Sequence, residues 1–212
     1  MHSILITTLF LVVAPFSTAA PAPLSLTRKD TALTEAQIVQ IAPTSENCDN
    51  PPAKGECATA HTAAKFASQS FDQYKVTNKA EQAAVLAIMA YESGDFKYNK
   101  NHYPGIPGQG TRNMQSAAFN KKYIASIPAL RESSARVADD AAALLELLLE
   151  NETYDFGSGA WFLTTQCTDE VRKALQSGSE AGWQSYITQC VGTSASGDRK
   201  AYWDRAVKAL GA

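Results

Sequence analysis

One glutamate in this sequence lies where helical spacing places it on an apolar face. Glu92 follows three apolar residues, Val85, Ile88 and Met89, by seven, four and three positions, so all four side chains share one face of a predicted helix. An apolar setting disfavours the charged form of a carboxyl group. The helix gives way to the turn residues Ser93-Gly94, where a buried face can open into a cleft. A neutral carboxylic acid there can protonate a glycosidic oxygen; the alternative is a glutamate paired with Arg or Lys in a polar core.

A second carboxylate would complete the chemistry of glycoside hydrolysis. Inverting hydrolysis requires a base about 6.5–9.5 Å from the acid, and retaining hydrolysis requires a nucleophile at about 5–5.5 Å. Asp95 is the first candidate because it is the only other carboxylate between Glu92 and Gln115, and Asp155 is the reserve. An exposed turn aspartate is the alternative for Asp95, and a mechanism with a single glutamate would use neither.

Aromatic and amide side chains surround the Gly- and Pro-rich segment 99–111. Sugars present apolar ring faces and hydroxyl edges, so a sugar-binding cleft combines aromatic rings with amide groups. Ordinary packing is the alternative for each tyrosine. The candidate substrate-binding residues are Tyr98, Tyr103, Gln109, Asn113 and Gln115.

The stretch from Glu92 to Gln115 resembles the active-site signature of the lysozyme-like superfamily. Glu92-Ser93 matches the Glu-Ser pair that ends a helix in goose-type lysozymes and lytic transglycosylases, and Asn113-Met114-Gln115 is similar to their Met-Gln motif. Phe96 comes one residue later than the matching aromatic, and Asn113 replaces a Leu. With GQGTRNMQ and the later AWFLTTQC, the mature chain is most similar to small secreted fungal muramidases.

The resemblance implies a muramidase with Glu92 as the general acid and Asp95 or a positioned water completing the reaction. Its substrate would be the β-1,4 linkage between N-acetylmuramic acid and N-acetylglucosamine in bacterial peptidoglycan. Three alternatives stay open: a lytic transglycosylase, a chitinase-like enzyme, and a non-catalytic wall-binding protein on the same fold.

Composition limits the partners of this chain. The sequence has 212 residues and a formal net charge of −2, with 19 Lys and Arg against 21 Asp and Glu, and a pI near 5.9. A nucleic-acid binder would need a clustered positive surface. The sequence also has no Cys or His spacing typical of zinc sites. We therefore expect no cofactor, metal, nucleic-acid partner or membrane association, and a monomer.

The N-terminus and the cysteines predict a secreted protein. An apolar run at residues 4–16, too short to span a bilayer, is followed by small residues, so residues 1–19 are predicted to be a signal peptide. Four cysteines allow three disulfide pairings; we favour Cys48–Cys57 and Cys167–Cys190 because each pair closes a local loop. Asn151-Glu152-Thr153 is a glycosylation sequon.

Helical patterns dominate the sequence, and strand patterns are scarce. The expected fold is mainly α, a lysozyme-like single domain over residues 48–212 with at most a small β-hairpin between residues 96 and 110. Residues 20–47 are expected to be an exposed extension or pro-segment with one short helix. A break is expected at Gly157-Ser158-Gly159. The predicted helices span residues 34–41, 57–74, 78–92, 113–126, 131–150, a short segment capped by Thr168, 179–191 and 198–210. Asn78 is expected to cap the helix over 78–92, and Gly211 to end the last helix. The helix over 131–150 has an apolar stripe of Val137, Ala141, Leu144, Leu145 and Leu148.

Overall fold

The computed structural model describes residues 32–212, and these form a mainly helical domain within a compact unit that runs from Thr31 to Ala212. The predicted signal peptide, residues 1–19, lies outside the described residues. In the part of the chain that is described, isolated bridges join Lys100 to Gly110 and Gly110 to Gln115 in place of the predicted hairpin. The helices are α1 (Glu35–Ile41), α2 (Ala60–Tyr74), α3 (Lys79–Glu92), α4 (Ala117–Ala125), α5 (Arg131–Arg136), α6 (Ala141–Leu149), α7 (Glu152–Gln166), α8 (Asp169–Leu175), α9 (Glu180–Ser185) and α10 (Gly197–Leu210), with short 3₁₀ helices η1 (Pro43–Glu46) and η2 (Pro128–Leu130) and the π-helix η3 (Tyr186–Val191).

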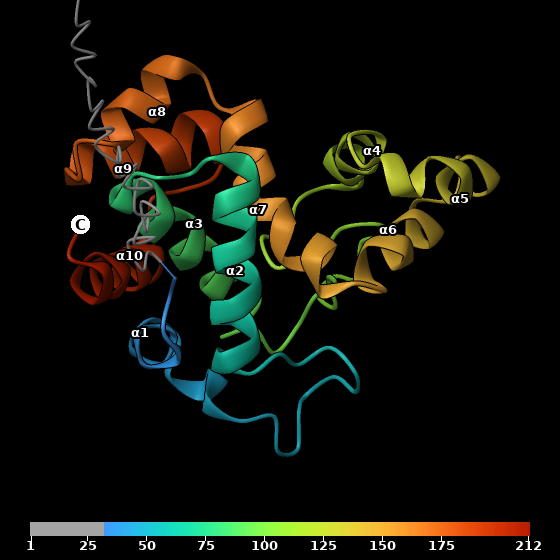
Figure 1. The fold of residues 1–212 in the computed structure, drawn as a ribbon, viewed down its shortest axis with the longest axis horizontal. Coiled ribbons are helices and arrows are strands. Elements are labelled where there is room, and N and C mark those ends of the chain that lie inside the picture. The colour runs from blue at the N-terminus through green and yellow to red at the C-terminus, as the bar shows by residue number, and fades with distance from the viewer. Residues whose placement is uncertain (1–31) are drawn as a thin grey trace, which may run out of the picture. The chain divides into compact units, whose positions relative to one another are not determined.

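Two hydrophobic cores hold these helices together. The larger core joins α1, α2 and α3 to α8, α9 and α10, and the smaller core lies among α4, η2 and α6. Helix α7 serves both, because Phe156 and Leu163 pack into the larger core while Trp161 and Phe162 pack into the smaller one. A helix that is buried on several sides carries apolar residues around most of its circumference. Figure 1 shows α7 between the two groups of helices.

The glycines of α7 do not interrupt the helix, so the predicted break at residues 157–159 is wrong. Both glycines lie where another element comes too close for a side chain. A Cβ at Gly159 would lie 2.6 Å from Met89 Sδ, and one at Gly157 would meet the hydroxyl of Tyr123. The helical cost of glycine, about 1 kcal/mol relative to alanine, is therefore offset by closer packing between helices.

The single helix predicted over residues 131–150 is two helices, α5 and α6, separated by residues 137–140. Asp140 starts the second helix, because its side chain accepts a hydrogen bond from the backbone N–H of Ala143 at 2.9 Å. Aspartate at an N-cap favours a helix start over continuation of the preceding helix. The apolar stripe predicted for this region remains in α6, where Leu144, Leu145 and Leu148 are buried.

The boundary predicted at residue 48 is also wrong, because residues 35–46 belong to the folded domain. Helix α1 begins at a capping box formed by Thr34 and Gln37. Ile38 and Ile41 are fully buried in the larger core. An exposed extension would leave such side chains in water; here they pack against α2 and α10.

Other local predictions are confirmed. Asn78 caps α3, Thr168 caps α8, and Gly211 ends α10 in the left-handed conformation. Both favoured disulfides are present. Cys48–Cys57 closes the loop before α2, and Cys167–Cys190 joins the end of α7 to η3. None of the helices in residues 32–212 has the length and apolar character needed to cross a bilayer.

Candidate functional site

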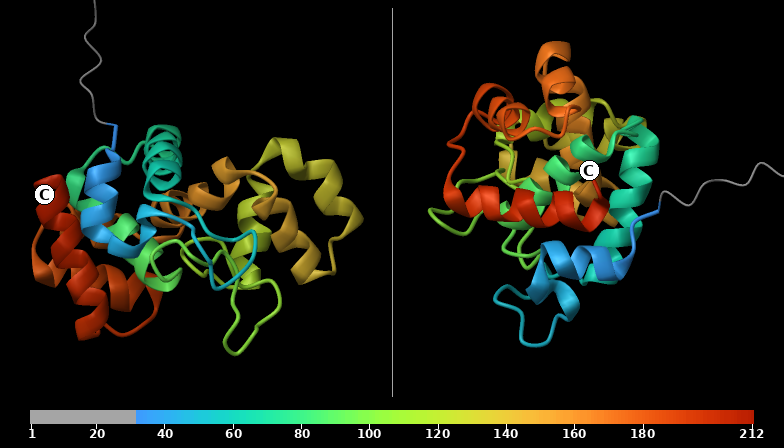
Figure 2. Two further views of the ribbon diagram at one scale, coloured as in Figure 1. Left: turned by 90° about the horizontal axis from the view of Figure 1, so that it is seen from below. Right: turned by 90° about the vertical axis from the view of Figure 1, so that its left-hand side faces the viewer.

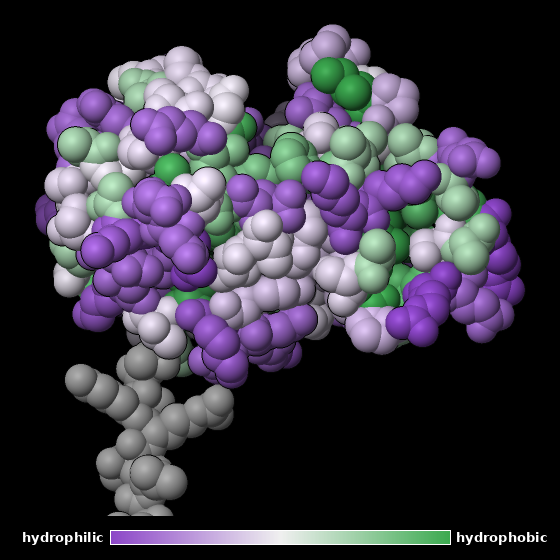
Figure 3. Space-filling model, turned by 90° about the horizontal axis from the view of Figure 1, so that it is seen from above, coloured by the Kyte–Doolittle hydropathy of each residue, from purple (hydrophilic) through white to green (hydrophobic). Residues whose placement is uncertain are grey.

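A groove passes over the C-terminal end of α3 at Glu92. It consists of two adjoining cavities of about 340 and 360 Å³, and Glu92, Gln109 and Met114 line both of them. The first cavity lies between the two groups of helices, where the wall includes Phe119 of α4 and Phe162 of α7. Figure 3 shows one face of the domain, with a notch in its outline and hydrophobic patches among hydrophilic residues. The second cavity is lined by Tyr91, Gly94, Tyr98, Lys100, Asn101, His102 and Tyr103.

Glu92 forms an ion pair with Arg199 at the floor of this groove. The guanidinium donates from Nε and Nη2 to Glu92 Oε1 at 3.2 and 2.9 Å. The side chain of Glu92 is 23% exposed and that of Arg199 is 15% exposed. Arg199 also donates to the carbonyl of Ser194 and lies 4.6 Å from the ring centre of Tyr91. Of the two alternatives for Glu92, the structure therefore has the glutamate paired with a cation. The sequence offers no signal for this pair because Arg199 lies 107 residues downstream.

Asp95 faces away from the groove and anchors the chain. Its Oδ2 accepts hydrogen bonds from the backbone N–H and the hydroxyl of Thr44, both at 2.9 Å, and its Oδ1 accepts from the hydroxyl of Tyr202 at 2.7 Å. Burial, reinforced by this hydrogen bond, raises the pKa of Tyr202 to about 12. Asp95 is 5% exposed. Among the described residues, those that line the two cavities do not include Asp95. It holds η1 and α10 together.

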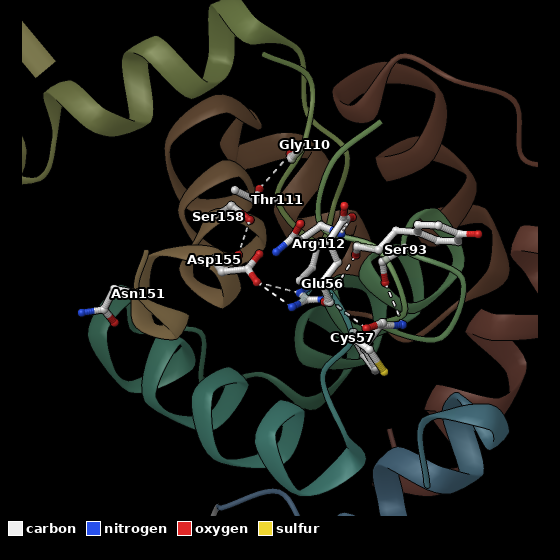
Figure 4. A network of polar contacts seen from close by, with 12 residues as sticks. Glu56, Cys57, Ser93, Gly110, Thr111, Arg112, Asn151, Asp155 and Ser158 are labelled. Atoms are coloured by element: carbon white, nitrogen blue, oxygen red, sulfur yellow. Dashed lines mark hydrogen bonds and ion pairs between the residues drawn. The ribbon is translucent and has the colours of Figure 1, made fainter. Parts of the chain in front are cut away.

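Asp155, the reserve carboxylate, is 2% exposed and lies in the interior beside Arg112 (Figure 4). Arg112 donates to its Oδ2 from Nε and Nη2 at 2.8 and 2.7 Å. Burial raises the pKa of the Asp155 carboxyl to about 6, although the Arg112 guanidinium opposes the shift. Arg112 Nη1 also donates to the carbonyls of Glu56, Phe96 and Tyr98 at 2.8, 2.8 and 3.1 Å. Arg112 therefore fixes the loops under the groove to α7, a function that sequence analysis did not assign to it.

The predicted amides of the groove shape their own loop through a chain of hydrogen bonds. Asn113 accepts from the hydroxyl of Thr111 at 3.0 Å and donates to Gln115 at 3.1 Å. Gln115 donates to Asn120 at 2.7 Å, and Asn120 donates to the carbonyl of Gly108 at 2.8 Å. The side-chain amides of Asn113 and Gln115 already have hydrogen-bond partners inside the protein. Their main role is therefore to shape the wall of the groove. Asn120, which closes the chain, was missed because it lies inside α4 with no motif around it.

Gln109 has a similar structural role. Its side-chain amide donates to the carbonyl of Met114 at 3.0 Å. The bond spans the turn between Gly110 and Gln115, which an isolated bridge joins, and keeps Met114 in the groove wall. Gln109 therefore lines the groove, and its amide group is bonded inside the protein.

Tyr98 and Tyr103 form the outer end of the groove. Both line the second cavity, and neither hydroxyl makes a hydrogen bond within residues 32–212. The ring of Tyr98 lies 5.2 Å from that of His102. Tyr103 is 88% exposed, and Ile106 beside it is 49% exposed. Exposed aromatic side chains on a fixed loop are common at ligand-binding surfaces.

The loop that carries these tyrosines is held by hydrogen bonds of Glu56 and Asn101. Glu56 accepts from the backbone N–H of Asn99 at 3.2 Å and lies 2.9 Å from His102 Nε2. Asn101 Oδ1 accepts from the backbone N–H groups of Gly105 and Ile106 at 2.8 and 3.1 Å. Figure 2 shows the loops before α2 and after α3 close together on the same side of the domain. In the described part of the chain, no group of three or more His, Cys, Asp or Glu side chains is placed to hold a metal ion.

Comparison with known proteins gives one informative match. No family model and no solved structure matches the chain. A bifunctional dioxygenase (DOX)-epoxy alcohol synthase (EAS) of Fusarium oxysporum (strain Fo5176) is 46% identical to it over 155 residues. The match covers 70% of this chain and 12% of the relative. The chain therefore spans about an eighth of the length of the curated relative that it matches.

This relative overturns the predicted enzyme class. The activities in its name are those of a dioxygenase and an epoxy alcohol synthase, and neither is hydrolysis of a glycosidic bond. The prediction of a glycoside hydrolase, with its muramidase, transglycosylase and chitinase-like forms, is corrected on this finding. The proposed acid and base roles of Glu92 and Asp95 fall with it, and the geometry gives both residues other partners.

Proposed function

We propose that this chain is a secreted binding module for polysaccharide, with bacterial peptidoglycan as the expected partner. The observation that carries the proposal is the continuity of the groove. Two cavities share Glu92, Gln109 and Met114 and extend from there in two directions. An extended ligand with repeating polar and apolar surfaces fits such a groove better than a compact one does. Volumes of this size are typical of ligand sites, about 300–1,000 Å³.

The chemistry of the wall suits a sugar chain. Tyr98 and Tyr103 offer ring faces at the outer end, where the apolar face of a sugar ring can stack. Of the two carboxylate oxygens of Glu92, Arg199 donates only to Oε1. Oε2 is therefore available to accept a hydrogen bond from a sugar hydroxyl or an acetamido N–H. A hydrogen bond to a charged acceptor is worth about 1.5–3 kcal/mol. Glu92 therefore supplies polar recognition at the centre of the groove.

The relative supports a module of this kind. A segment of 155 residues that makes up 12% of a longer protein is a unit that occurs joined to other parts. The two disulfides support secretion, because disulfides persist in oxidising compartments.

Binding to purified peptidoglycan tests the proposal. The full chain is mixed with insoluble peptidoglycan, and depletion from solution gives the dissociation constant. Glu92→Gln keeps the shape of the side chain and a neutral carbonyl acceptor but removes the charge. The loss is then the difference between a charged and a neutral hydrogen bond, about 1–1.5 kcal/mol, so we expect the dissociation constant to rise by about 5- to 13-fold. Tyr98→Ala should also weaken binding. The matched control is Glu132→Gln, on an exposed glutamate of α5, which should bind as the unaltered chain does.

Two results would overturn the proposal. One is an unaltered chain that insoluble peptidoglycan does not deplete from solution and that does not bind soluble N-acetylglucosamine oligomers at millimolar concentration. The other is binding that Glu92→Gln and Tyr98→Ala leave unchanged, since the ligand would then sit elsewhere.

A second candidate function rests on the identity to the curated relative. At 46% identity over 155 residues, we propose as the alternative that the chain takes part in the dioxygenase or epoxy alcohol synthase reactions named for that protein. Dioxygen uptake by the purified chain, measured with an oxygen electrode, would favour this alternative. Depletion by peptidoglycan without dioxygen uptake would favour the binding module.

A further inference from the structure

The start of α7 presents an asparagine that neither the cores nor the groove use. Asn151 is exposed and caps this 15-residue helix. It begins Asn151-Glu152-Thr153, the one Asn-X-Ser/Thr sequence in the chain with X other than proline. This pattern is the acceptor for N-linked glycans when it lies on the surface of a secreted protein.

The geometry leaves the acceptor nitrogen of Asn151 available. Its Oδ1 accepts a hydrogen bond from the backbone N–H of Thr153 at 2.8 Å, which forms an Asx turn. Its Nδ2 makes no hydrogen bond within residues 32–212. In Figure 4 the side chain points away from Asp155 and the other labelled residues. The oxygen is therefore committed to the helix cap while the nitrogen faces outward.

We propose that Asn151 carries an N-linked glycan. The proposal rests on the secreted location proposed above and not on polysaccharide binding. In the transfer step, Nδ2 loses one proton and forms a bond to the anomeric carbon of the first sugar of a lipid-linked oligosaccharide. The bond from that carbon to the lipid diphosphate breaks, and the lipid diphosphate leaves with the electron pair. The amide oxygen stays as it was, so the helix cap survives the modification.

The position of Asn151 is compatible with an open groove. Phe162, the groove residue of α7, lies eleven residues further along the chain. At 1.5 Å per residue this separates the two by about 16 Å along the helix. A glycan on Asn151 thus begins at the end of α7 remote from the ligand cavity.

Three variants separate the sequon from the helix cap. Thr153→Ser keeps the sequon, and Thr153→Ala removes it while leaving Asn151 in place. Asn151→Asp removes the acceptor nitrogen but retains a good capping residue. All four full-length chains are expressed in a eukaryotic host that glycosylates secreted proteins, and the mass of each intact chain is measured before and after treatment with a peptide N-glycosidase.

We expect the unaltered chain and Thr153→Ser to lose the mass of an oligosaccharide on treatment, with Asn151 converted to Asp. Thr153→Ala and Asn151→Asp should show no change. An unaltered chain without this mass, whether secreted or retained in the cell, would overturn the proposal, as would a glycan mass that persists in Asn151→Asp. Because peptidoglycan depletion is a separate readout, failure here is distinguishable from failure of the binding proposal.

Discussion

Protonation of Asp155 provides a sharp test of the forces in the interior beneath the groove. The carboxyl is buried beside the Arg112 guanidinium, and Glu152 is the nearby acidic group that opposes its ionisation. Burial raises its pKa from 3.8 to about 6 and outweighs the attraction of the guanidinium. Between these two values the folded protein keeps a proton that the unfolded chain has lost. The free energy of unfolding therefore falls as the pH rises through this range.

The size of the effect follows from the shift. One pKa unit corresponds to about 1.4 kcal/mol, so a rise from 3.8 to about 6 corresponds to about 3 kcal/mol. This contribution is fully present only well below pH 3.8 and is lost as the pH rises through about 6. Asp155→Asn removes the titrating group and should show no such dependence. Arg112→Met removes the opposing cation, so its decline should continue above pH 6.

Urea unfolding at several pH values between 4 and 8 measures these differences. The difference in unfolding free energy between the unaltered chain and Asp155→Asn should fall by about 2 kcal/mol between pH 4 and 6.5 and change little above that. Asp139→Asn, on an exposed aspartate between α5 and α6, is the control for a change in net charge. If the difference instead grows with pH, the ion pair outweighs burial and the reasoning is refuted.

Two further predictions concern packing and cross-linking. Gly159→Ala should destabilise the domain by about 1–3 kcal/mol, since the added carbon would lie 2.6 Å from Met89 Sδ. The control is Gly197→Ala, at a helical position with open space around it. In the same urea titration this variant should be neutral or stabilising by up to about 1 kcal/mol. Replacing Cys167 and Cys190 by serine should cost about 3 kcal/mol by loss of the constraint on the unfolded chain, and an unchanged unfolding midpoint would contradict this.

The sequence correctly predicted those features of the structure that depend on residues close together in the chain. Asn78 and Thr168 were identified as caps because the side-chain oxygen of a cap bonds to a backbone N–H only two or three residues away. The helical class followed from the spacing of apolar residues, as for α6. The two disulfides followed from their short loops.

Predictions failed where the deciding partner lies far along the chain. Gly157-Ser158-Gly159 has the composition of a break, yet Tyr123 and Met89 pack so closely against it that glycine serves the helix. The expected exposure of residues 35–46 failed because their apolar side chains find partners in α2 and α10.

The candidate site shows the same division. From the sequence, Glu92, Tyr98, Tyr103, Gln109, Asn113 and Gln115 were all expected near one cleft, and all six line the groove. The sequence did not determine their chemical roles, because each role depends on which group the side chain contacts in the folded protein.

The sequence by itself determined that this chain is helical, where most of its helices begin, and which residues lie around Glu92, since these depend on spacing and on bonds between near neighbours. Only the tertiary structure decided that Glu92 is paired with Arg199, that Asp95 ties η1 to α10, and that Arg112 and Asp155 meet in the interior. The physical reason is that the state of a carboxyl group depends on burial and on the charges within a few ångströms of it. In this protein those charges come from residues 43 and 107 positions away.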